Sequence, residues 1–241
     1  MAQKKIIIVG ATSGIGKALA CKYAVEHQKV AITGRRNELL NDLKEQYPNQ
    51  IISSCFDVRS AESREMIRQL IVELGGLDLL IYNAGYGAVS EQLNWENEKE
   101  ITDINVNGFI AIVNYAFEFF IQQGYGQIAI TSSIAALRGN GLAPAYSASK
   151  AFMSVYAEGL NIKSKNLKRD ITITDIRPGF MDTKPSEWHK RFWVVPVEKA
   201  AEQIFYAISR KKRVVYISKR WWFVAQLMKF TPFGIYRKIV S

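Results

Sequence analysis

The sequence predicts an α/β fold, a doubly wound parallel β-sheet of about seven strands flanked by helices on both faces. Two observations carry this prediction. Short apolar, β-branched runs alternate along the chain with stretches of helical spacing. The first run, residues 5–9, is continuously apolar, as expected of a parallel strand that is buried on both sides. Alternating strands and helices pack as one layered sheet with right-handed crossovers.

The elements follow in order along the chain. Strands are expected at residues 5–9, 30–33, 51–56, 77–82, 127–132, 171–177 and 214–217. Helices are expected from the glycine-rich turn to about residue 27, and then at 38–46, 61–74, 97–123, 144–168 and 197–209. Ser60 is the expected N-cap of the third helix, and Pro144 suits the first turn of the fifth. No repeat or linker is present, so residues 1–218 are predicted to form one domain.

Composition limits the class of protein. The chain has 241 residues, of which 48% are hydrophobic, enough for one domain with a sizeable core. Cys21 and Cys55 are isolated, and His27 and His189 are the two histidines, so neither a disulfide framework nor a metal site is expected. The apolar run near the N-terminus is too short for a signal peptide. We expect a cytoplasmic protein.

The net charge of +10 is concentrated at one end of the chain. No Asp or Glu follows Glu202, whereas nine basic residues do, so the preceding part carries 23 basic and 22 acidic residues, or +1. A nearly neutral domain with a basic end is not the pattern of a uniformly basic nucleic-acid-binding protein. No nucleic-acid partner is therefore expected.

The turn after the first strand has the spacing GxxxGxG over residues 10–16. Gly10 permits a tight turn, Gly14 lets the backbone approach a phosphate, and Gly16 lets helix and strand pack closely. A glycine motif alone also fits an ordinary turn. Its position between a buried strand and a helix favours a pyrophosphate-binding loop.

The end of the second strand indicates which dinucleotide is preferred. A site for NAD places an acidic residue there, and this chain has Arg35 and Arg36 instead. A solvated strand end is the alternative, but with the phosphate loop present we expect NADP(H) rather than NAD(H). After the third strand, Asp57 is expected to accept a hydrogen bond from an adenine amino group.

Tyr146 and Lys150 lie four residues apart, so both project from one face of the predicted helix. An ammonium group beside a phenol stabilises the phenolate, so we expect the pKa of Tyr146 to fall towards neutrality, where a proton donor works best. Taken alone, the pattern also fits an accidental surface pair.

Together these motifs resemble the short-chain dehydrogenase/reductase family over about residues 4–218, with a Rossmann-like sheet. The resemblance rests on residues 10–16, Asp57-Val58, Asn83-Ala84-Gly85, Asn105 in an Asn-x-x-Gly frame, Ser133, Tyr146-x-x-x-Lys150, and Pro178-Gly179 with Thr183. Tyr82 is one departure, since the family often has Asn there.

The resemblance implies hydride transfer between a nicotinamide and a carbonyl or alcohol carbon. It implies four catalytic residues: Tyr146 as proton donor, Ser133 holding the carbonyl oxygen, Lys150 holding the ribose, and Asn105 holding a relay water. Ser132 and Asn107 are the obvious alternatives to Ser133 and Asn105. The residues implied to bind the cofactor are Gly10, Thr12, Ser13, Gly14, Ile15, Gly16, Arg35, Arg36, Asp57, Val58, Asn83, Ala84, Gly85, Tyr146, Lys150, Pro178, Gly179 and Thr183.

The substrate pocket is expected at three loops, residues 86–95, 134–143 and 180–195. Their large apolar side chains suggest a bulky, hydrophobic or lipid-like small molecule: Leu137, Leu142, Phe180, Trp188, Phe192 and Trp193. The family resemblance implies a homodimer or homotetramer through helices 97–123 and 144–168. A catalytically idle dinucleotide-binding sensor or scaffold is the alternative function.

Residues 219–241 form a basic, aromatic C-terminal extension beyond the resemblance. Lys219, Arg220, Lys229 and Pro232 interrupt its apolar residues, so no run is long enough to span a membrane. Aromatic residues interleaved with basic ones suit the surface of a membrane that carries anionic lipid. Packing over the substrate cleft or against a neighbouring subunit is the open alternative.

Overall fold

A seven-stranded, all-parallel sheet with the order β3-β2-β1-β4-β5-β6-β7 forms the centre of the protein in a computed structural model, which describes residues 3–182 and 193–240. Every predicted strand is present, with each end within two residues of its expected position. The strands are β1 (Lys5–Val9), β2 (Lys29–Gly34), β3 (Ile51–Cys55), β4 (Leu79–Tyr82), β5 (Tyr125–Thr131), β6 (Asp170–Pro178) and β7 (Val214–Ile217). The predicted fold class is confirmed.

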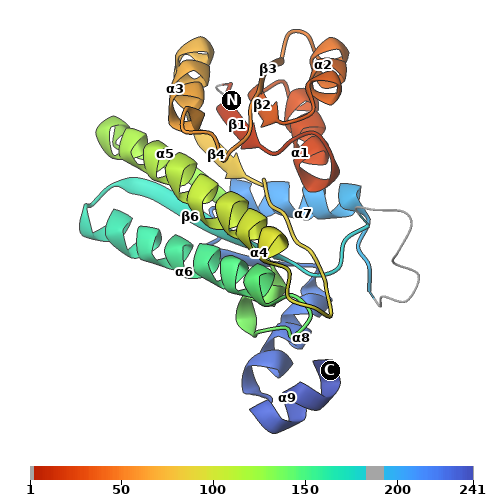
Figure 1. Cartoon of the computed structure of the whole chain (residues 1–241). Coiled ribbons are helices and arrows are strands. Elements are labelled where there is room, and N and C mark those ends of the chain that lie inside the picture. Colours follow the sequence, from red (N-terminus) through yellow and green to blue (C-terminus); the bar gives the residue numbers. More distant parts are fainter. Residues whose placement is uncertain (1–2, 183–192, 241) are drawn as a thin grey trace.

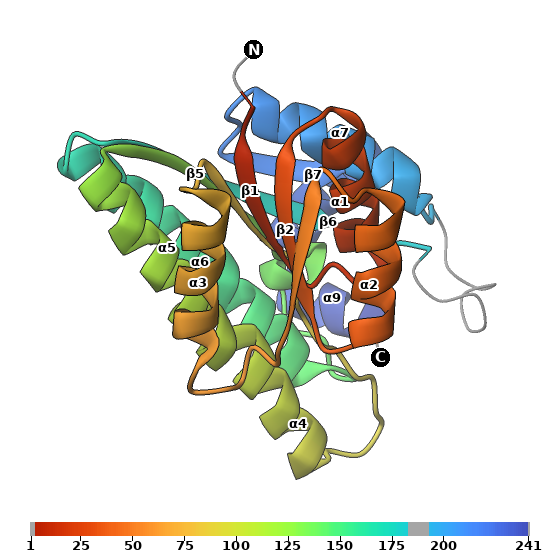
Figure 2. The ribbon, with the colours of Figure 1, turned by 90° about the horizontal axis from the view of Figure 1, so that it is seen from above.

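Helices cover both faces of the sheet, with α1, α2 and α7 on one side and α3, α5 and α6 on the other (Figure 2). Their bounds are α1 (Gly14–Val25), α2 (Asn37–Gln46), α3 (Ser63–Leu74), α4 (Trp95–Thr102), the π-helix η1 (Asp103–Gly108), α5 (Phe109–Gln123), the 3₁₀-helix η2 (Ile134–Leu137), α6 (Pro144–Asn166), α7 (Val197–Ser209), α8 (Lys219–Phe230) and α9 (Phe233–Val240).

Two sequence-based expectations about helices were wrong. Ser60 does not cap α3, which begins at Ser63; the Ser60 hydroxyl instead lies in the preceding turn and accepts a hydrogen bond from the backbone N–H of Glu62. The helix predicted over residues 97–123 begins earlier, at Trp95, and is interrupted by η1. Periodicity does not reveal a π-helix, because its wider turn changes the backbone without changing the apolar pattern much.

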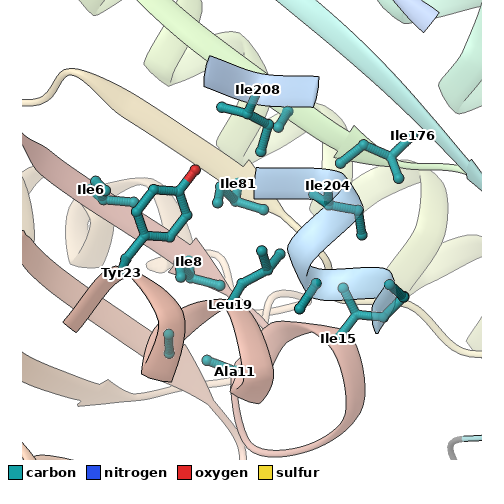
Figure 3. Packing of buried hydrophobic residues seen from close by; sticks show 14 of the residues in the cluster. Ile6, Ile8, Ala11, Ile15, Leu19, Tyr23, Ile81, Ile176, Ile204 and Ile208 are labelled. Atoms are coloured by element: carbon teal, nitrogen blue, oxygen red, sulfur yellow. The ribbon is translucent and has the colours of Figure 1, made fainter. Parts of the chain in front are cut away.

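The strands are apolar throughout because both faces of the sheet are buried. In β1, Ile6 and Ile8 face the α1 and α7 side (Figure 3), while Ile7 and Val9 face the α3, α5 and α6 side. All four side chains are fully buried. Burial of each stabilises the fold by about 1.5–3 kcal/mol.

One helical stretch among the described residues, Trp95–Gln123, is long and apolar enough to cross a membrane by length and composition. Half of its most apolar window is buried inside the protein, and core helices pass the same test. Phe109, Phe117 and Phe120 of this stretch pack in the core on the α5 side. We therefore treat the stretch as a core element.

The strand order reverses between β1 and β4, which pair side by side while their connections leave to opposite faces. In open parallel sheets, ligands bind at the carboxyl ends of the strands at such a reversal. Gly10 follows β1 and Asn83 follows β4 at this point. The fold thus places the predicted phosphate loop and the Asn83-Ala84-Gly85 segment next to one another.

Candidate active site

The predicted catalytic side chains meet where β5 ends and α6 begins. Pro144 is the first residue of α6, and Lys150 lies two turns further on. The Lys150 Nζ donates a hydrogen bond of 2.9 Å to the carbonyl oxygen of Thr131, the last residue of β5. The same Nζ lies 5.9 Å from the centre of the Tyr146 ring. The backbone of β5 therefore fixes the ammonium beside the phenol.

Burial affects the two groups in opposite directions. It raises the pKa of Tyr146, and a hydrogen bond with Ser133 opposes that rise in part. It lowers the pKa of Lys150 to about 8, while the nearby Asp175 carboxylate opposes that change. Desolvation disfavours each charged form. The lowered Tyr146 pKa expected from the sequence is therefore wrong for these surroundings, because burial of the phenol outweighs its hydrogen bond with Ser133.

The structure separates Ser133 from its neighbour Ser132. Ser132 donates its hydroxyl hydrogen to Asp175 and lies against the carbonyl oxygen of Ile176 at 3.1 Å. Ser133 caps η2, where its Oγ accepts a hydrogen bond of 3.1 Å from the N–H of Ala135. Of the two, Ser133 is therefore the one hydrogen-bonded to Tyr146, and Ser132 is a structural residue.

The end of β5 and the start of α6 form a corner around Tyr146. A buried carboxylate, which the sequence analysis missed, connects the two sides of this corner by hydrogen bonds. Asp175 in β6 is 2% exposed and accepts hydrogen bonds from Ser132, before Ser133, and from Ser154, one turn beyond Lys150. Arg177 donates to it from Nε at 2.7 Å and also to the Ser154 hydroxyl at 2.8 Å. A charged residue inside an otherwise buried strand was the available signal, because such groups are rarely buried unless paired.

Asn105 lies inside the π-helix η1 and is fully buried. Its side chain exchanges hydrogen bonds of 2.9 and 2.8 Å with the backbone of Tyr86 and donates one of 2.9 Å to Ser149. A side chain on Gly85 would approach both the Asn105 Oδ1 and the Lys150 Nζ, so this glycine leaves room between them. Asn107, the alternative, is exposed and hydrogen-bonds Asp103 instead. Single-turn π segments are frequent at functional sites.

The glycine-rich turn has the close approaches that its sequence predicts. Gly10 and Gly14 both have positive φ, at 84° and 55°. A Cβ on Gly10 would lie 2.6 Å from the backbone nitrogen of Ala84, and one on Gly16 would lie 2.1 Å from the carbonyl oxygen of Gly10. Asn83 braces the turn by donating a hydrogen bond of 3.1 Å to that same carbonyl. Neither position has room for a side chain, so the turn packs closely against Ala84 and against the first turn of α1.

The start of α1 also fits a phosphate electrostatically. No acidic residue lies in its first turn, and the side chain of Ser13 makes no capping bond there. The Arg36 guanidinium reaches across and donates hydrogen bonds to Thr12 at 2.6 Å and to Ser13 at 2.8 Å. Helix N-termini and guanidinium groups both favour phosphate oxygens. The residues present therefore fit a phosphorylated dinucleotide.

The neighbouring Arg35 and Asp57 are less available. Arg35 lies 3.9 Å from the Asp57 carboxylate and 3.6 Å from that of Glu100. Both oxygens of Asp57 accept hydrogen bonds from Arg59, which holds the pKa of that carboxyl below its usual range. An adenine amino group at Asp57 would have to share the carboxylate with Arg59, a residue that the sequence analysis did not single out.

The remaining predicted cofactor residues take different positions. Ile15 is in the core, and the carbonyl oxygen of Val58 lies against Gly108. Pro178 presents its carbonyl oxygen to the Ser133 hydroxyl at 3.5 Å. A side chain on Gly179 would collide with the Trp221 indole of α8, so this glycine accommodates the C-terminal helices. Thr183 lies outside the described residues, as do Trp188 and Phe192 of the predicted substrate pocket.

The predicted substrate loop at residues 86–95 contacts the catalytic tyrosine candidate directly. A Cβ on Gly87 would lie 2.7 Å from the Tyr146 ring, so the loop backbone packs against that ring. The backbone N–H of Ser90 donates a hydrogen bond of 2.9 Å to the carbonyl oxygen of Leu142 in the second predicted loop. No group of three His, Cys, Asp or Glu side chains among the described residues is arranged to hold a metal ion.

Comparison with known proteins agrees with this site and fold. The family model described as short chain dehydrogenase matches residues 4–190. An uncharacterized oxidoreductase of Myxococcus xanthus is 33% identical over 190 residues, which are 76% of this chain and 74% of the relative. Another, of Mycobacterium tuberculosis, is 30% identical over 192 residues, which are 76% and 75% of the two chains. The chain belongs to the short-chain dehydrogenase/reductase family and is an oxidoreductase of that family.

Solved structures show the same fold at lower identity. A structure described as ElxO with NADP bound has a TM-score of 0.79 and 22% identity, covering 90% of this chain and 97% of that one. A short chain dehydrogenase from Bacillus anthracis has a TM-score of 0.81 and 24% identity, with 88% and 94% covered. Both structures cover a larger share of the chain than the family match does.

Proposed function

We propose that the protein catalyses NADP(H)-dependent hydride transfer between the nicotinamide and the carbonyl or alcohol carbon of a small hydrophobic molecule. The observation that carries the proposal is the meeting of Ser133, Tyr146 and Lys150 at the carboxyl end of β5. This corner opens at the same edge of the sheet as the phosphate loop that follows β1. A nicotinamide bound there would supply or accept the hydride.

Tyr146 is the proposed proton donor in the direction of reduction. Because burial raises its pKa, the phenol keeps its proton at neutral pH and can give it to the oxygen of a reduced carbonyl. Ser133, hydrogen-bonded to Tyr146, is placed to orient that oxygen. Tyr146 belongs to α6 and Ser133 caps η2, so ordered helices fix the positions of both groups.

Lys150 is proposed to hold the ribose hydroxyls and to support Tyr146 electrostatically. With a pKa of about 8, the ammonium is mostly protonated at neutral pH. Its positive charge stabilises negative charge that forms on the Tyr146 oxygen when the proton leaves. Asn105, separated from Lys150 by the space over Gly85, is proposed to hold a water that returns a proton to the site.

We propose that Arg36 contributes more than Arg35 to a preference for NADP(H). Among the described residues no carboxylate pairs with Arg36, and its guanidinium contacts only the hydroxyls of Thr12 and Ser13. Arg35 already lies near two carboxylates. The uncompensated charge at the start of α1 suits a 2′-phosphate, and the structural neighbour ElxO has NADP bound.

Steady-state kinetics on a panel of carbonyl compounds, with NADPH and NADH in parallel, tests the proposal. Arg36→Ala is expected to raise the KM for NADPH about tenfold or more while leaving that for NADH unchanged, since a charge-assisted contact is lost only with NADPH. Arg35→Ala is expected to have the smaller effect. Arg68→Ala, on the surface of α3, is the matched control.

Two outcomes would contradict the proposal. Equal losses with both cofactors would remove the role assigned to Arg36. Binding of NADPH with no turnover of any carbonyl or alcohol would favour the alternative, a catalytically idle dinucleotide sensor or scaffold.

We also propose a homodimer or homotetramer formed through the outer faces of α5 and α6. Val155 and Ile162 on α6 are exposed apolar residues seven apart, and so they lie on one face. The mass in solution tests this proposal, with Val155→Glu expected to lower it.

A further inference from the structure

Six exposed large apolar side chains gather on the outer surface of α8 and α9. Phe230 is 81% exposed, Phe233 72%, Leu227 69% and Phe223 67%, and Trp222 and Ile235 are also exposed. Contiguous exposed apolar patches on a protein surface mark interaction sites. These helices project beyond the sheet at one end of the molecule (Figure 1).

The helix α8 has one exposed face and one buried face. Phe223, Leu227 and Phe230 recur at spacings of four and three residues, so they share one face. Trp221 and Ala225 lie on the opposite face and are buried against the protein. The outward apolar face is therefore separate from the face that attaches the helix.

The attachment is specific, so the apolar face is held in a fixed orientation. The Trp221 indole occupies the space left by Gly179. Arg138, after η2, donates hydrogen bonds of 2.9 and 2.8 Å to the carbonyl oxygens of Met228 and Thr231. Its guanidinium also lies 4.4 Å from the centre of the Tyr236 ring, and the Tyr236 hydroxyl donates to Gly139 at 3.0 Å.

Basic residues surround the apolar face. Residues 219–241 contain five Lys or Arg and no Asp or Glu. At the helical angle between residues, Arg220 lies at one edge of the α8 apolar face and Lys219 at the other. Apolar side chains flanked by basic ones suit the boundary of a bilayer with anionic headgroups, because the apolar groups enter the acyl region while the cations stay at the phosphates.

Charge also decides between a membrane and a second copy of this chain. A symmetric self-interface would place the same patch against itself, five positive charges facing five. Like charges brought together without counter-charges repel one another. An anionic bilayer supplies the opposite charge and accepts the exposed phenylalanines.

The proposed membrane face is connected to the substrate side of the active site. The helix α8 packs against η2, which begins directly after Ser133. Leu142, beyond η2, is exposed and is joined through its carbonyl to Ser90 in the loop that also packs on Tyr146. Exposed apolar residues continue along that loop at Val89 and Leu93.

We propose that α8 and α9 dock the protein on a membrane carrying anionic lipid, and that its substrate is a membrane-resident amphiphile with a carbonyl or alcohol group. The substrate class rests on the hydride-transfer function proposed above; the docking does not. A molecule that leaves the bilayer beside α8 would reach the loops around Tyr146 without crossing water.

Vesicle co-sedimentation tests the docking without any substrate. The full-length protein is expected to bind phosphatidylcholine vesicles that contain phosphatidylglycerol, less so at high salt, and to bind phosphatidylcholine alone weakly. The double variant Phe223→Glu, Phe230→Glu is expected to bind about tenfold less tightly, or weaker still. Val72→Glu, at a site on α3 that is also 67% exposed, is the matched control and is expected to bind as wild type.

Activity on two substrates tests whether the substrate reaches the active site from the membrane. With a long-chain methyl ketone carried in the vesicles, the double variant is expected to lose turnover in proportion to binding, whereas its turnover of a short, water-soluble ketone stays unchanged. Loss on the soluble ketone as well would mean that the substitutions damage the active site, and would count against a separate docking face.

Other outcomes overturn the proposal. Failure of the wild-type protein to bind anionic vesicles would refute docking, whatever the enzyme assay shows. A lower mass in solution for the double variant, with no vesicle binding by wild type, would assign the face to a second copy of the chain. Vesicle binding without reduction of any ketone by NADPH would leave docking standing and refute the hydride-transfer function.

Discussion

The corner around Tyr146 and the surface of α8 and α9 use the same kinds of residue, aromatic and basic, for different ends. In the corner, Lys150 and Arg177 are enclosed and each donates hydrogen bonds at fixed distances. On α8, Phe223 and Phe230 point outward. The difference teaches that burial decides the role of such residues. Burial shifts the pKa values of the enclosed groups and fixes their positions. Exposure leaves the apolar area and the charges of α8 and α9 available to a partner.

The largest expected effect comes from removing the phenolic hydroxyl. Tyr146→Phe is expected to lower kcat about 10²–10⁴-fold, the usual contribution of a positioned general acid. NADPH affinity, measured by fluorescence titration, should stay near that of wild type because the ring and its packing against Gly87 remain. Wild-type turnover in this variant would remove the corner from the chemistry.

Neighbouring tryptophans in α8 allow the inside and outside of the same helix to be compared. Trp221 is 1% exposed and Trp222 is 46% exposed. Trp221→Ala is expected to lower the free energy of unfolding by about 3–5 kcal/mol through the cavity it leaves. Trp222→Ala should change it by less than about 0.5 kcal/mol. Urea denaturation measures both, and similar losses would mean that α8 is attached differently.

The smallest expected effect is a change in pH dependence. The negative charge of Asp175 raises the pKa of Lys150 and partly offsets its burial. Asp175→Asn removes that charge, so Lys150 should lose its proton at lower pH, and the alkaline limb of the kcat/KM profile should move to lower pH from near 8. Ser154→Ala keeps the charge and removes one hydrogen bond, so it is the control.

An unmoved profile in Asp175→Asn would show that the carboxylate serves packing alone. The measurement is made at a temperature where the folded state of both variants has been verified by circular dichroism, because loss of Asp175 also leaves Arg177 without its buried partner.

The sequence predicted the fold well because the apolar strands leave little choice. Runs such as residues 5–9 can be buried on both sides only in a covered parallel sheet. The sequence predicted local features poorly where neither the apolar periodicity nor the spacing of residues carries information. The π-helix around Asn105 is one case, and the pKa of Tyr146 is another, since the desolvation that raises it depends on chain segments distant in sequence.

The sequence by itself determined the family, the positions of the strands and most helices, and the set of Ser133, Tyr146 and Lys150. These follow from local spacing and residue type. Only the tertiary structure decided that Ser132 is committed to Asp175, that Arg36 rather than Arg35 contacts the phosphate loop, and that α8 buries Trp221 while exposing Phe223. The physical reason is the same in each case. Hydrogen-bond partners and desolvation are set by residues far apart in the chain, which only folding brings into contact.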